Sequence, residues 1–441
     1  MKRYLFALGM TMCASQAGSA GTNESSIDQL GDGGVVEVSQ NSAVSGGLNS
    51  SDVQQTGSDN HAKVNQTFNS IAHFFGDPGS NISTIQQAGA GNHVQADQAH
   101  DIFGDGTGTN ISDVMQVGTA HEATVSQSNA NTTIQSTIDQ NGDGHRSAIT
   151  QSGLATGITS SIEQAGVGQE ATVTQHAFGS AFDALPTLES QIQQTGFGNK
   201  ANVVQGTNSF GTRSLIQQDG TDQIADVQQT ASFLDARSTI SQSGSENTAL
   251  VKQSGVDQTH VSAIDVDGTS NQTEVLQGYG GGFGPSWYDS AIIIDGNGNN
   301  VRVLQDSHQD TLSSTVTAVG DGNSVIVDQK AVGGTLVSIA ELNGASNELS
   351  VIQSAFGDQS AGNTSHVLVN GAANEIAVTQ NILPADGSSP GAGNISQVEI
   401  DGTSNQITVT QDILASGATG VNNSVLNTVG NANSVNIIQQ Q

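Results

Sequence analysis

The chain has 441 residues, of which 54 are glycine, 12% are charged and 4% are aromatic, and its formal net charge is −31. This acidic balance argues against nucleic-acid binding, because phosphates are bound by clustered lysine and arginine. The charged fraction is too low for a charged disordered tail. A composition dominated by Asn, Gln, Ser, Thr and Gly is typical of polar sequences that form aggregated β-structure.

Residues 1–20 have the features of a secretory signal peptide. Lys2 and Arg3 precede an apolar stretch over residues 4–13, and residues 18–20 are small and suit cleavage. The only cysteine, Cys13, would leave with this segment, although a lipid attachment site at Cys13 is an alternative interpretation. No later apolar run is long enough for a transmembrane helix. We therefore expect an exported chain without disulfides.

One phrase then recurs sixteen times, and internal repetition of this kind decides the architecture. In the ninth copy it reads Ser238, Ile240, Gln242, Gly244, Asn247, Ala249, Val251 and Gln253. In every copy a glycine stands six residues after the serine and a glutamine fifteen residues after it. The serines are Ser25, Ser51, Ser83, Ser112, Ser136, Ser160, Ser190, Ser214, Ser238, Ser262, Ser290, Ser314, Ser338, Ser365, Ser396 and Ser424.

The spacing within each copy predicts two short strands joined by a tight turn. Residues two apart share one face of a strand, and the recurring positions change parity at the glycine, where a turn favours positive φ. The serines of successive copies are most often 24 residues apart, which is enough for two strands and two turns. We call this unit one rung. Identical rungs can stack with parallel, in-register pairing. The predicted fold is all-β, a parallel β-solenoid of about sixteen stacked strand-turn-strand repeats.

We expect the inward polar positions to form ladders along the stack, because a buried amide can pair with its own copy in the next rung. The clearest ladder and turn positions fall in repeats 2, 7 and 9 and in the last repeat. The proposed ladder residues are Ser51, Gln55, Asn60, Gln66, Ser190, Gln194, Asn199, Gln205, Ser238, Gln242, Asn247, Gln253, Asn433 and Gln439. The proposed turn glycines are Gly57, Gly196, Gly244 and Gly430.

The repeats divide by composition into residues 21–253 and 254–441. Repeats 1–9 have glutamine four residues after the serine, ending at Gln242, whereas Val266 begins a mostly apolar run at the same position. We expect the second half to have a more apolar core with the same fold.

These residues resemble the curlin repeat, the unit of curli, the extracellular amyloid fibres of bacterial biofilms. The family phrase is matched nearly in full by residues 51–66, 190–205 and 238–253. The resemblance implies export through an outer-membrane curli-type secretion channel, nucleation by a partner subunit at the cell surface and growth into a homopolymeric fibre. The chain resembles the major fibre subunit more closely, and the minor nucleating subunit is the alternative.

Longer linkers interrupt the period and hold most of the aromatic residues. One interpretation is that these linkers contact other fibrils or matrix partners. The interpretation that we prefer is that they pack on the flank of the rod. The linkers are Thr67–Ile82, Ala99–Ile111, His176–Glu189, Gly278–Asp289, Ser354–Thr364, Asn381–Ile395 and Asp412–Asn423.

No catalytic, cofactor or metal site is predicted. His121 and His145 occupy the asparagine position of successive repeats and are expected to stack, which is weak evidence for zinc without a third ligand. Asp-Gly turns such as Asp267-Gly268 lack the nine-residue cadence of calcium-binding β-rolls.

The sequence therefore favours a secreted, non-enzymatic structural subunit of a curli-like fibre for biofilm matrix and surface adhesion. Open strand edges at both ends would template further chains. A monomeric β-solenoid adhesin or surface-layer protein, and more remotely a glycan-active β-helix enzyme, remain as alternatives.

Overall fold

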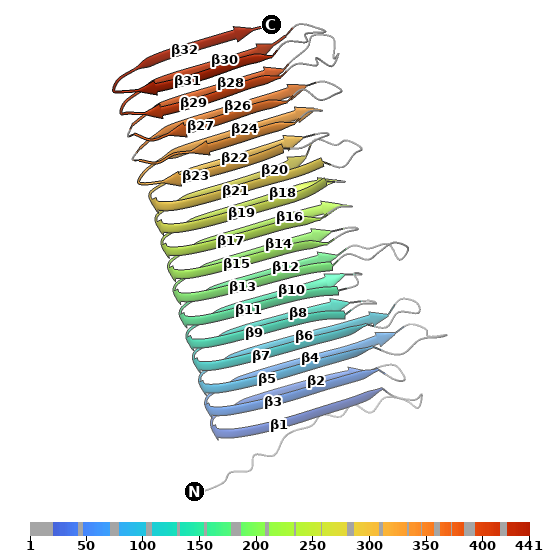
Figure 1. The fold of residues 1–441 in the computed structure, drawn as a ribbon. Helices are drawn as coiled ribbons and strands as arrows, with labels where there is room; N and C mark the ends of the chain where they lie inside the picture. Colours follow the sequence, from blue (N-terminus) through green and yellow to red (C-terminus); the bar gives the residue numbers. More distant parts are fainter. Residues whose placement is uncertain are drawn as a thin grey trace.

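The strands form two sheets of sixteen parallel strands, and each rung contributes one strand to each sheet. The computed structural model describes residues 21–42, 47–70, 79–102, 108–129, 133–153, 157–177, 187–207, 211–232, 235–256, 258–279, 286–307, 312–332, 335–344, 346–356, 362–371, 373–382, 393–414 and 421–441. The regular structure of these residues is entirely β-strand. The expected all-β parallel solenoid is thereby confirmed. Figure 1 shows the rungs stacked in chain order into a rod, with the turns along one edge.

The first strand of each rung belongs to what we call the odd sheet. Its strands are β1 (Thr22–Asp32), β3 (Leu48–Ser58), β5 (Ser80–Ala90), β7 (Thr109–Thr119), β9 (Thr133–Asp143), β11 (Gly157–Val167), β13 (Thr187–Phe197), β15 (Thr212–Thr221), β17 (Ala236–Ser245), β19 (Gln258–Thr269), β21 (Ser286–Asn297), β23 (Leu312–Val319), β25 (Leu336–Glu341), β27 (Asn363–Val369), β29 (Asn394–Asp401) and β31 (Asn422–Val429).

The second strand of each rung belongs to the even sheet. Its strands are β2 (Val35–Ser42), β4 (His61–Ser70), β6 (His93–Ile102), β8 (Glu122–Asn129), β10 (Arg146–Gly153), β12 (Glu170–Ala177), β14 (Lys200–Thr207), β16 (Ile224–Ser232), β18 (Thr248–Val256), β20 (Gln272–Tyr279), β22 (Asn300–Ser307), β24 (Ser324–Val332), β26 (Glu348–Phe356), β28 (Glu375–Ile382), β30 (Gln406–Ile413) and β32 (Ser434–Gln440).

Every strand pairs in register with its copy in the next rung. Ser51 lies beside Ser83 although 32 residues separate them, and Ser136 lies beside Ser160 at the shorter spacing of 24. The sheets continue without a break across Gln253 and Ser262. The register is therefore set by the repeated phrase, and the variable linkers are accommodated outside the ladders.

The core lies between the two sheets and runs the length of the rod. Along β3, buried and more exposed residues alternate, so Val53 faces the core while Asp52 faces outward. Val64 of β4 faces Val53 from the other sheet within the same apolar cluster. Charged residues such as Lys63 and Lys252 take the outward parity.

The turn between the strands explains the unbroken glycine position. Gly57 has φ of 116°, and a Cβ there would lie 1.9 Å from the carbonyl oxygen of Gly89 in the next rung. Two residues on, Asp59 also has positive φ, at 55°, and this left-handed position tolerates other residues. Glycine is thus required where the turns stack closely.

The strands extend further than the sequence indicated, so the predicted linkers are too wide. Residues 67–70 belong to β4 and residues 80–82 to β5. Phe68 and Tyr288 are strand residues that are almost fully buried, which fits packing on the rod and not an exposed role. Trp287 is 61% exposed. The predicted signal peptide, residues 1–20, and Phe74, Phe75, Phe103, Phe178, Phe182 and Phe283 lie outside the described residues.

Candidate functional site: amide ladders and outermost rungs

The glutamine that ends each repeat forms an unbroken ladder through the even sheet. From Gln40 to Gln439, the Nε2 of each glutamine donates to the Oε1 of its copy in the next rung at 2.7–3.2 Å. The ladder includes Gln66, Gln205 and Gln253. All its bonds point the same way, so the ladder has a donor end and an acceptor end.

The same glutamines also join the two sheets. Gln66 donates through Nε2 to the main-chain carbonyl of Ser50 in the odd sheet at 2.8 Å, and Gln439 donates in the same way to Asn423 at 2.9 Å. Each interior amide therefore uses one hydrogen across the rung and the other along the rod. Such an amide is satisfied only when the next rung is in register.

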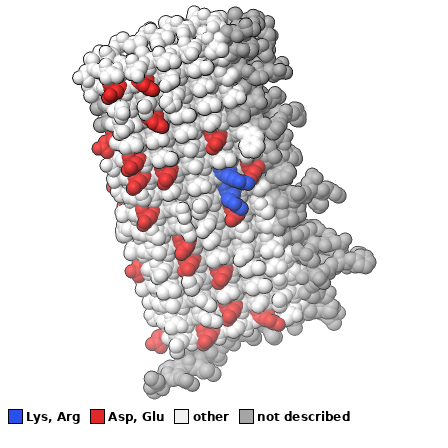
Figure 2. All heavy atoms as spheres, in the orientation of Figure 1, with Lys and Arg blue, Asp and Glu red and all other residues white. Residues whose placement is uncertain are grey.

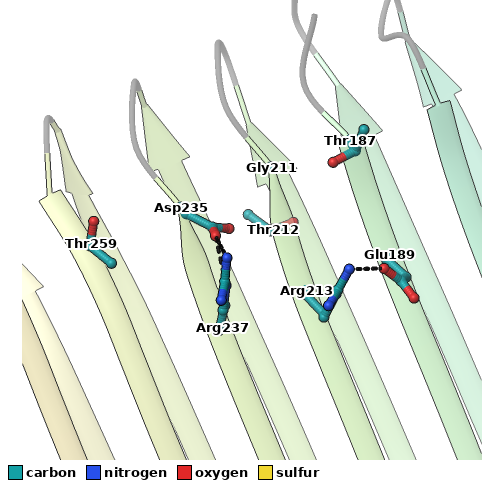
Figure 3. A pocket seen from close by; sticks show the side chains of 8 residues that line it. All are labelled: Thr187, Glu189, Gly211, Thr212, Arg213, Asp235, Arg237 and Thr259. Atoms are coloured by element: carbon teal, nitrogen blue, oxygen red, sulfur yellow. Dashed lines mark hydrogen bonds and ion pairs between the residues drawn. The ribbon is translucent and has the colours of Figure 1, made fainter.

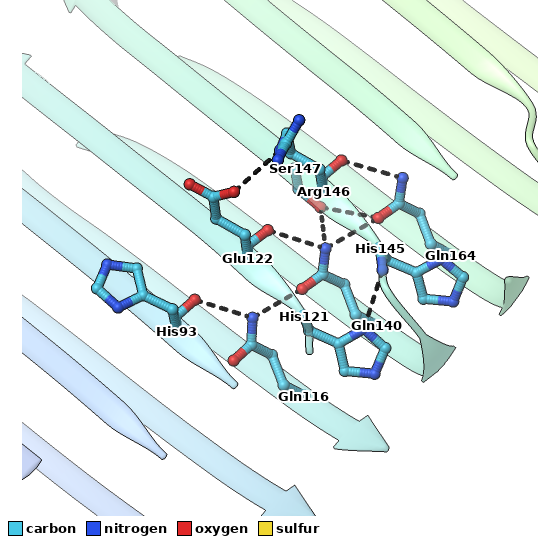
Figure 4. Close-up of polar contacts among 9 residues, drawn as sticks. All are labelled: His93, Gln116, His121, Glu122, Gln140, His145, Arg146, Ser147 and Gln164. Carbon is cyan, nitrogen blue, oxygen red and sulfur yellow. Dashed lines mark hydrogen bonds and ion pairs between the residues drawn. The ribbon is translucent and has the colours of Figure 1, made fainter. Parts of the chain in front are cut away.

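A second glutamine ladder runs along the odd sheet from Gln29 to Gln242 and includes Gln55 and Gln194. Its Nε2 to Oε1 distances are 2.7–3.0 Å. Figure 4 shows the section in which Gln140 links Gln116 to Gln164. The ladder ends at Gln242, whose buried Nε2 has no partner.

The asparagine that opens each even strand makes a ladder of the opposite polarity. From Asn247 to Asn433, each Oδ1 accepts both the side-chain Nδ2 and the main-chain N–H of the following asparagine, at 2.9–3.2 Å. Before Asn247, the residue that opens the even strand is not always asparagine. Asn60 and Asn199 still accept the next main-chain N–H, at 3.1 and 3.0 Å.

The serines do not form the continuous ladder that was expected of them, although Ser112 donates to Ser83 at 3.1 Å. The hydroxyls of Ser190 and Ser238 are buried without a partner among the described residues, and Ser51 receives a long contact from Nε2 of Gln40 at 3.5 Å. Adjacent rungs are about 4.8 Å apart, whereas a hydroxyl pair needs about 2.8 Å. An amide spans this gap because its donor and acceptor are different atoms. Serine instead fills a narrow inward position.

Sequence reasoning missed one further ladder, two residues before the serine. Asn49 donates to Asn23 at 2.9 Å, Asn81 donates to Asn49 at 2.9 Å, and Asn422 donates to Asn394 at 3.1 Å. In the middle of the rod this position is mostly apolar or aromatic, with Thr212 as an exception, and there it contributes to two small additional cores. The signal was present in the sequence, but these residues fell within or beside segments interpreted as linkers.

The predicted stacking of histidines is confirmed. The rings of His121 and His145 lie 5.0 Å apart and within 10° of parallel (Figure 4). Burial lowers the pKa of both groups, which favours the neutral form. Within the described ranges, no group of three or more His, Cys, Asp or Glu side chains is arranged to hold a metal ion.

A shallow hollow on the odd sheet holds two arginines on neighbouring rungs (Figure 3). Arg213 pairs with Glu189 and Arg237 pairs with Asp235, each at 2.7 Å. Because each guanidinium already has a carboxylate partner, the hollow offers little net charge to a ligand. Elsewhere on the face seen in Figure 2, acidic side chains are scattered and do not form a cluster.

The outermost described rungs leave part of the apolar core uncovered. Six apolar residues pack against the main core while remaining only partly buried, and all lie in these two rungs: Ile27, Val36, Val38, Leu426, Val435 and Ile437. No described strand covers β1 and β2 at one end or β31 and β32 at the other. The inward columns therefore continue to both ends of the described rod.

The chain matches no family model and no curated protein. Within the part of the chain that the structure describes, no helix has the length and apolar character needed to cross a membrane.

Proposed function

We propose that this chain is a secreted structural subunit that assembles end to end into curli-like fibres of an extracellular matrix. The observation that carries the proposal is the continuity of the inward columns up to both outermost rungs. The resemblance of the repeats to curlin supports an extracellular fibre. The same resemblance supports two partners, a subunit that nucleates the fibre and an outer-membrane channel that secretes the chain.

Stacking the last rung of one chain on the first rung of another would extend each column. Ile437 would meet Val38, and Leu426 would meet Ile27, so apolar meets apolar. Burying half-exposed side chains of this size is favourable by about 1 kcal/mol or more each. A contact between two different surfaces does not close on itself and so yields a filament.

The amide ladders would set the direction and register of this contact. Gln439 has used one Nε2 hydrogen on Asn423, and in interior rungs the other hydrogen binds the next glutamine. The matching acceptor at the opposite end is Oε1 of Gln40, whose own Nε2 donates to Gln66. A slipped or inverted addition would leave these buried amides without partners, at about 1–3 kcal/mol each.

A pair of adjacent residues provides a direct test. In β32, Ile437 faces inward and packs against the core, whereas Ile438 faces outward and is 63% exposed. Ile437→Lys places a charge in the stacking surface and should abolish fibre growth from purified protein, measured by thioflavin fluorescence and electron microscopy. Ile438→Lys adds the same charge outside that surface and should leave growth near wild type.

Two outcomes would contradict the proposal. One is equal growth of the two variants, and the other is wild-type protein that remains monomeric at high concentration. The second result would favour the alternative of a monomeric solenoid adhesin.

A further inference from the structure

The outer face of the even sheet carries an unusual patch across β18, β20, β22 and β24. Apolar side chains point toward solvent there, and Ile326 is 43% exposed. Four charged residues of both signs are interleaved with them, in a chain whose net charge is −31. We call this the even-sheet patch: Leu250, Lys252, Glu274, Leu276, Arg302, Leu304, Ile326 and Asp328.

The patch consists of two neighbouring outward columns. One column contains Leu250, Glu274, Arg302 and Ile326, which lie side by side on successive rungs, and the other contains Lys252, Leu276, Leu304 and Asp328. Within these two columns each rung therefore presents one apolar and one charged side chain. Within the chain, Arg302 pairs with Glu274 at 2.6 Å, and Asp328 lies 3.8 Å from Nζ of Lys330 in the adjoining outward column.

This order is self-complementary under a two-fold axis. Consider an axis that runs along the strand direction between β20 and β22, parallel to the face. It reverses the rod and brings β20 opposite β22 of a second copy. Glu274 then faces Arg302 of the second copy, and Leu276 faces its Leu304.

The rungs on either side of this pair are also complementary. The axis brings β18 opposite β24 of the second copy, so Lys252 faces Asp328 and Leu250 faces Ile326. All four kinds of contact are complementary, and symmetry makes each occur twice. We propose that two copies of this chain pair laterally, with their rods antiparallel, through the even-sheet patch.

Neighbouring registers would be unfavourable. An axis centred on β22 would place Arg302 against Arg302 of the second copy, and an axis centred on β20 would place Glu274 against Glu274. Like charges in direct opposition are destabilising. The sequence of the patch therefore selects one register out of three adjacent ones.

The size of the patch predicts weak pairing of single rods. An eight-residue strand is about 27 Å long and four rungs span about 19 Å, giving about 500 Å² per copy. Stable interfaces bury about 800 Å² per partner. Lateral pairing should thus be concentration-dependent. It does not require end-to-end assembly, although rods joined in fibres would repeat the contact and strengthen it through avidity.

Charge exchange tests the pairing. Lys252→Asp would oppose Asp328 of an identical copy, and Asp328→Lys would oppose Lys252, so each variant alone should pair about tenfold more weakly in sedimentation experiments. An equimolar mixture of the two variants restores opposite charges at both contacts and should recover wild-type pairing. Both substitutions are on the outer face, and circular dichroism checks that the fold is kept. Failure of the mixture to recover, or wild-type behaviour of both single variants, would overturn the proposal.

Cysteine cross-linking in a Cys13→Ser background tests the orientation. Leu250→Cys on one chain and Ile326→Cys on another lie opposite each other in the antiparallel pair and should form a disulfide when the two variants are mixed. Leu250→Cys alone should not cross-link, because two copies of position 250 are about 14 Å apart along the rod. Efficient 250-to-250 cross-linking, or none between 250 and 326, would contradict the antiparallel register whether or not fibres form.

Discussion

The side-chain amide of Gln242 has no acceptor because the residue beside it in the next rung is Val266. The first glutamine ladder therefore ends inside the rod, with an unpaired buried donor. Leaving such a donor unsatisfied costs about 1–3 kcal/mol. The change from amide to apolar residues that divides the two halves of the sequence thus has a local energetic consequence.

The same substitution should change the unfolding free energy by different amounts at the end of this ladder and in its middle. Gln242→Ile removes the unpaired donor and loses one bond, from Gln218, so the unfolding free energy should change by less than about 1 kcal/mol. Gln164→Ile breaks the ladder in mid-course, between Gln140 and Gln194, and should cost about 2–4 kcal/mol. Urea denaturation of both variants measures the difference, and equal destabilisation would refute the role of ladder position.

The two kinds of turn glycine should also respond differently to alanine. Gly57→Ala forces a Cβ against the carbonyl of Gly89 at 1.9 Å and should lower the thermal midpoint sharply or prevent folding. Gly91→Ala has no atom within 4 Å of the new Cβ, and Ala120 already occupies the same turn position with φ of 57°. Its effect should stay within about 1–2 kcal/mol. A milder effect at Gly57 than at Gly91 would contradict the stacked-turn geometry.

His260 should make the rod sensitive to mild acid. Its ring stacks on Tyr288 at 4.4 Å, and burial lowers the pKa of His260 to about 4 from its usual 6.5. The unfolded chain therefore binds the proton more readily than the folded chain between these values. The contribution to stability is complete above pH 6.5 and is lost as the pH falls toward 4, by about 3 kcal/mol.

His260→Phe keeps an aromatic ring in the column and removes the titrating group. The variant should lose less stability than wild type between pH 6.5 and 4, as measured by denaturant unfolding at several pH values. Subtracting the two curves removes contributions from the other histidines and the acids. Parallel curves would show that His260 does not carry this dependence.

The histidine stack should be replaceable by the residue that usually occupies its position. A His121→Asn, His145→Asn double variant can form the side-chain and main-chain bonds seen from Asn247 onward, and its stability should equal or exceed that of wild type. Zinc should not alter the melting temperature of either protein. A zinc-dependent gain that disappears in the double variant would instead identify a metal site.

Much of the fold followed from the sequence because its strongest constraints are periodic. The serine, glycine and terminal glutamine positions identified each rung, and in-register pairing of Ser51 with Ser83 confirmed that variable spacing does not shift the register. What escaped prediction depended on geometry across rungs. The spacing between rungs excludes a general serine ladder, and Asn49 and Phe68 belong to strand extensions that were interpreted as linker or left unassigned.

We propose that the end rungs stack in register with a second copy, and imaging of assembled fibres by electron cryo-microscopy would resolve this contact. We expect rungs spaced at about 4.8 Å without interruption, and a molecular repeat of about 77 Å along the fibre. Fibres whose molecular repeat departs from this length, or whose rung spacing breaks at the molecular boundary, would contradict it.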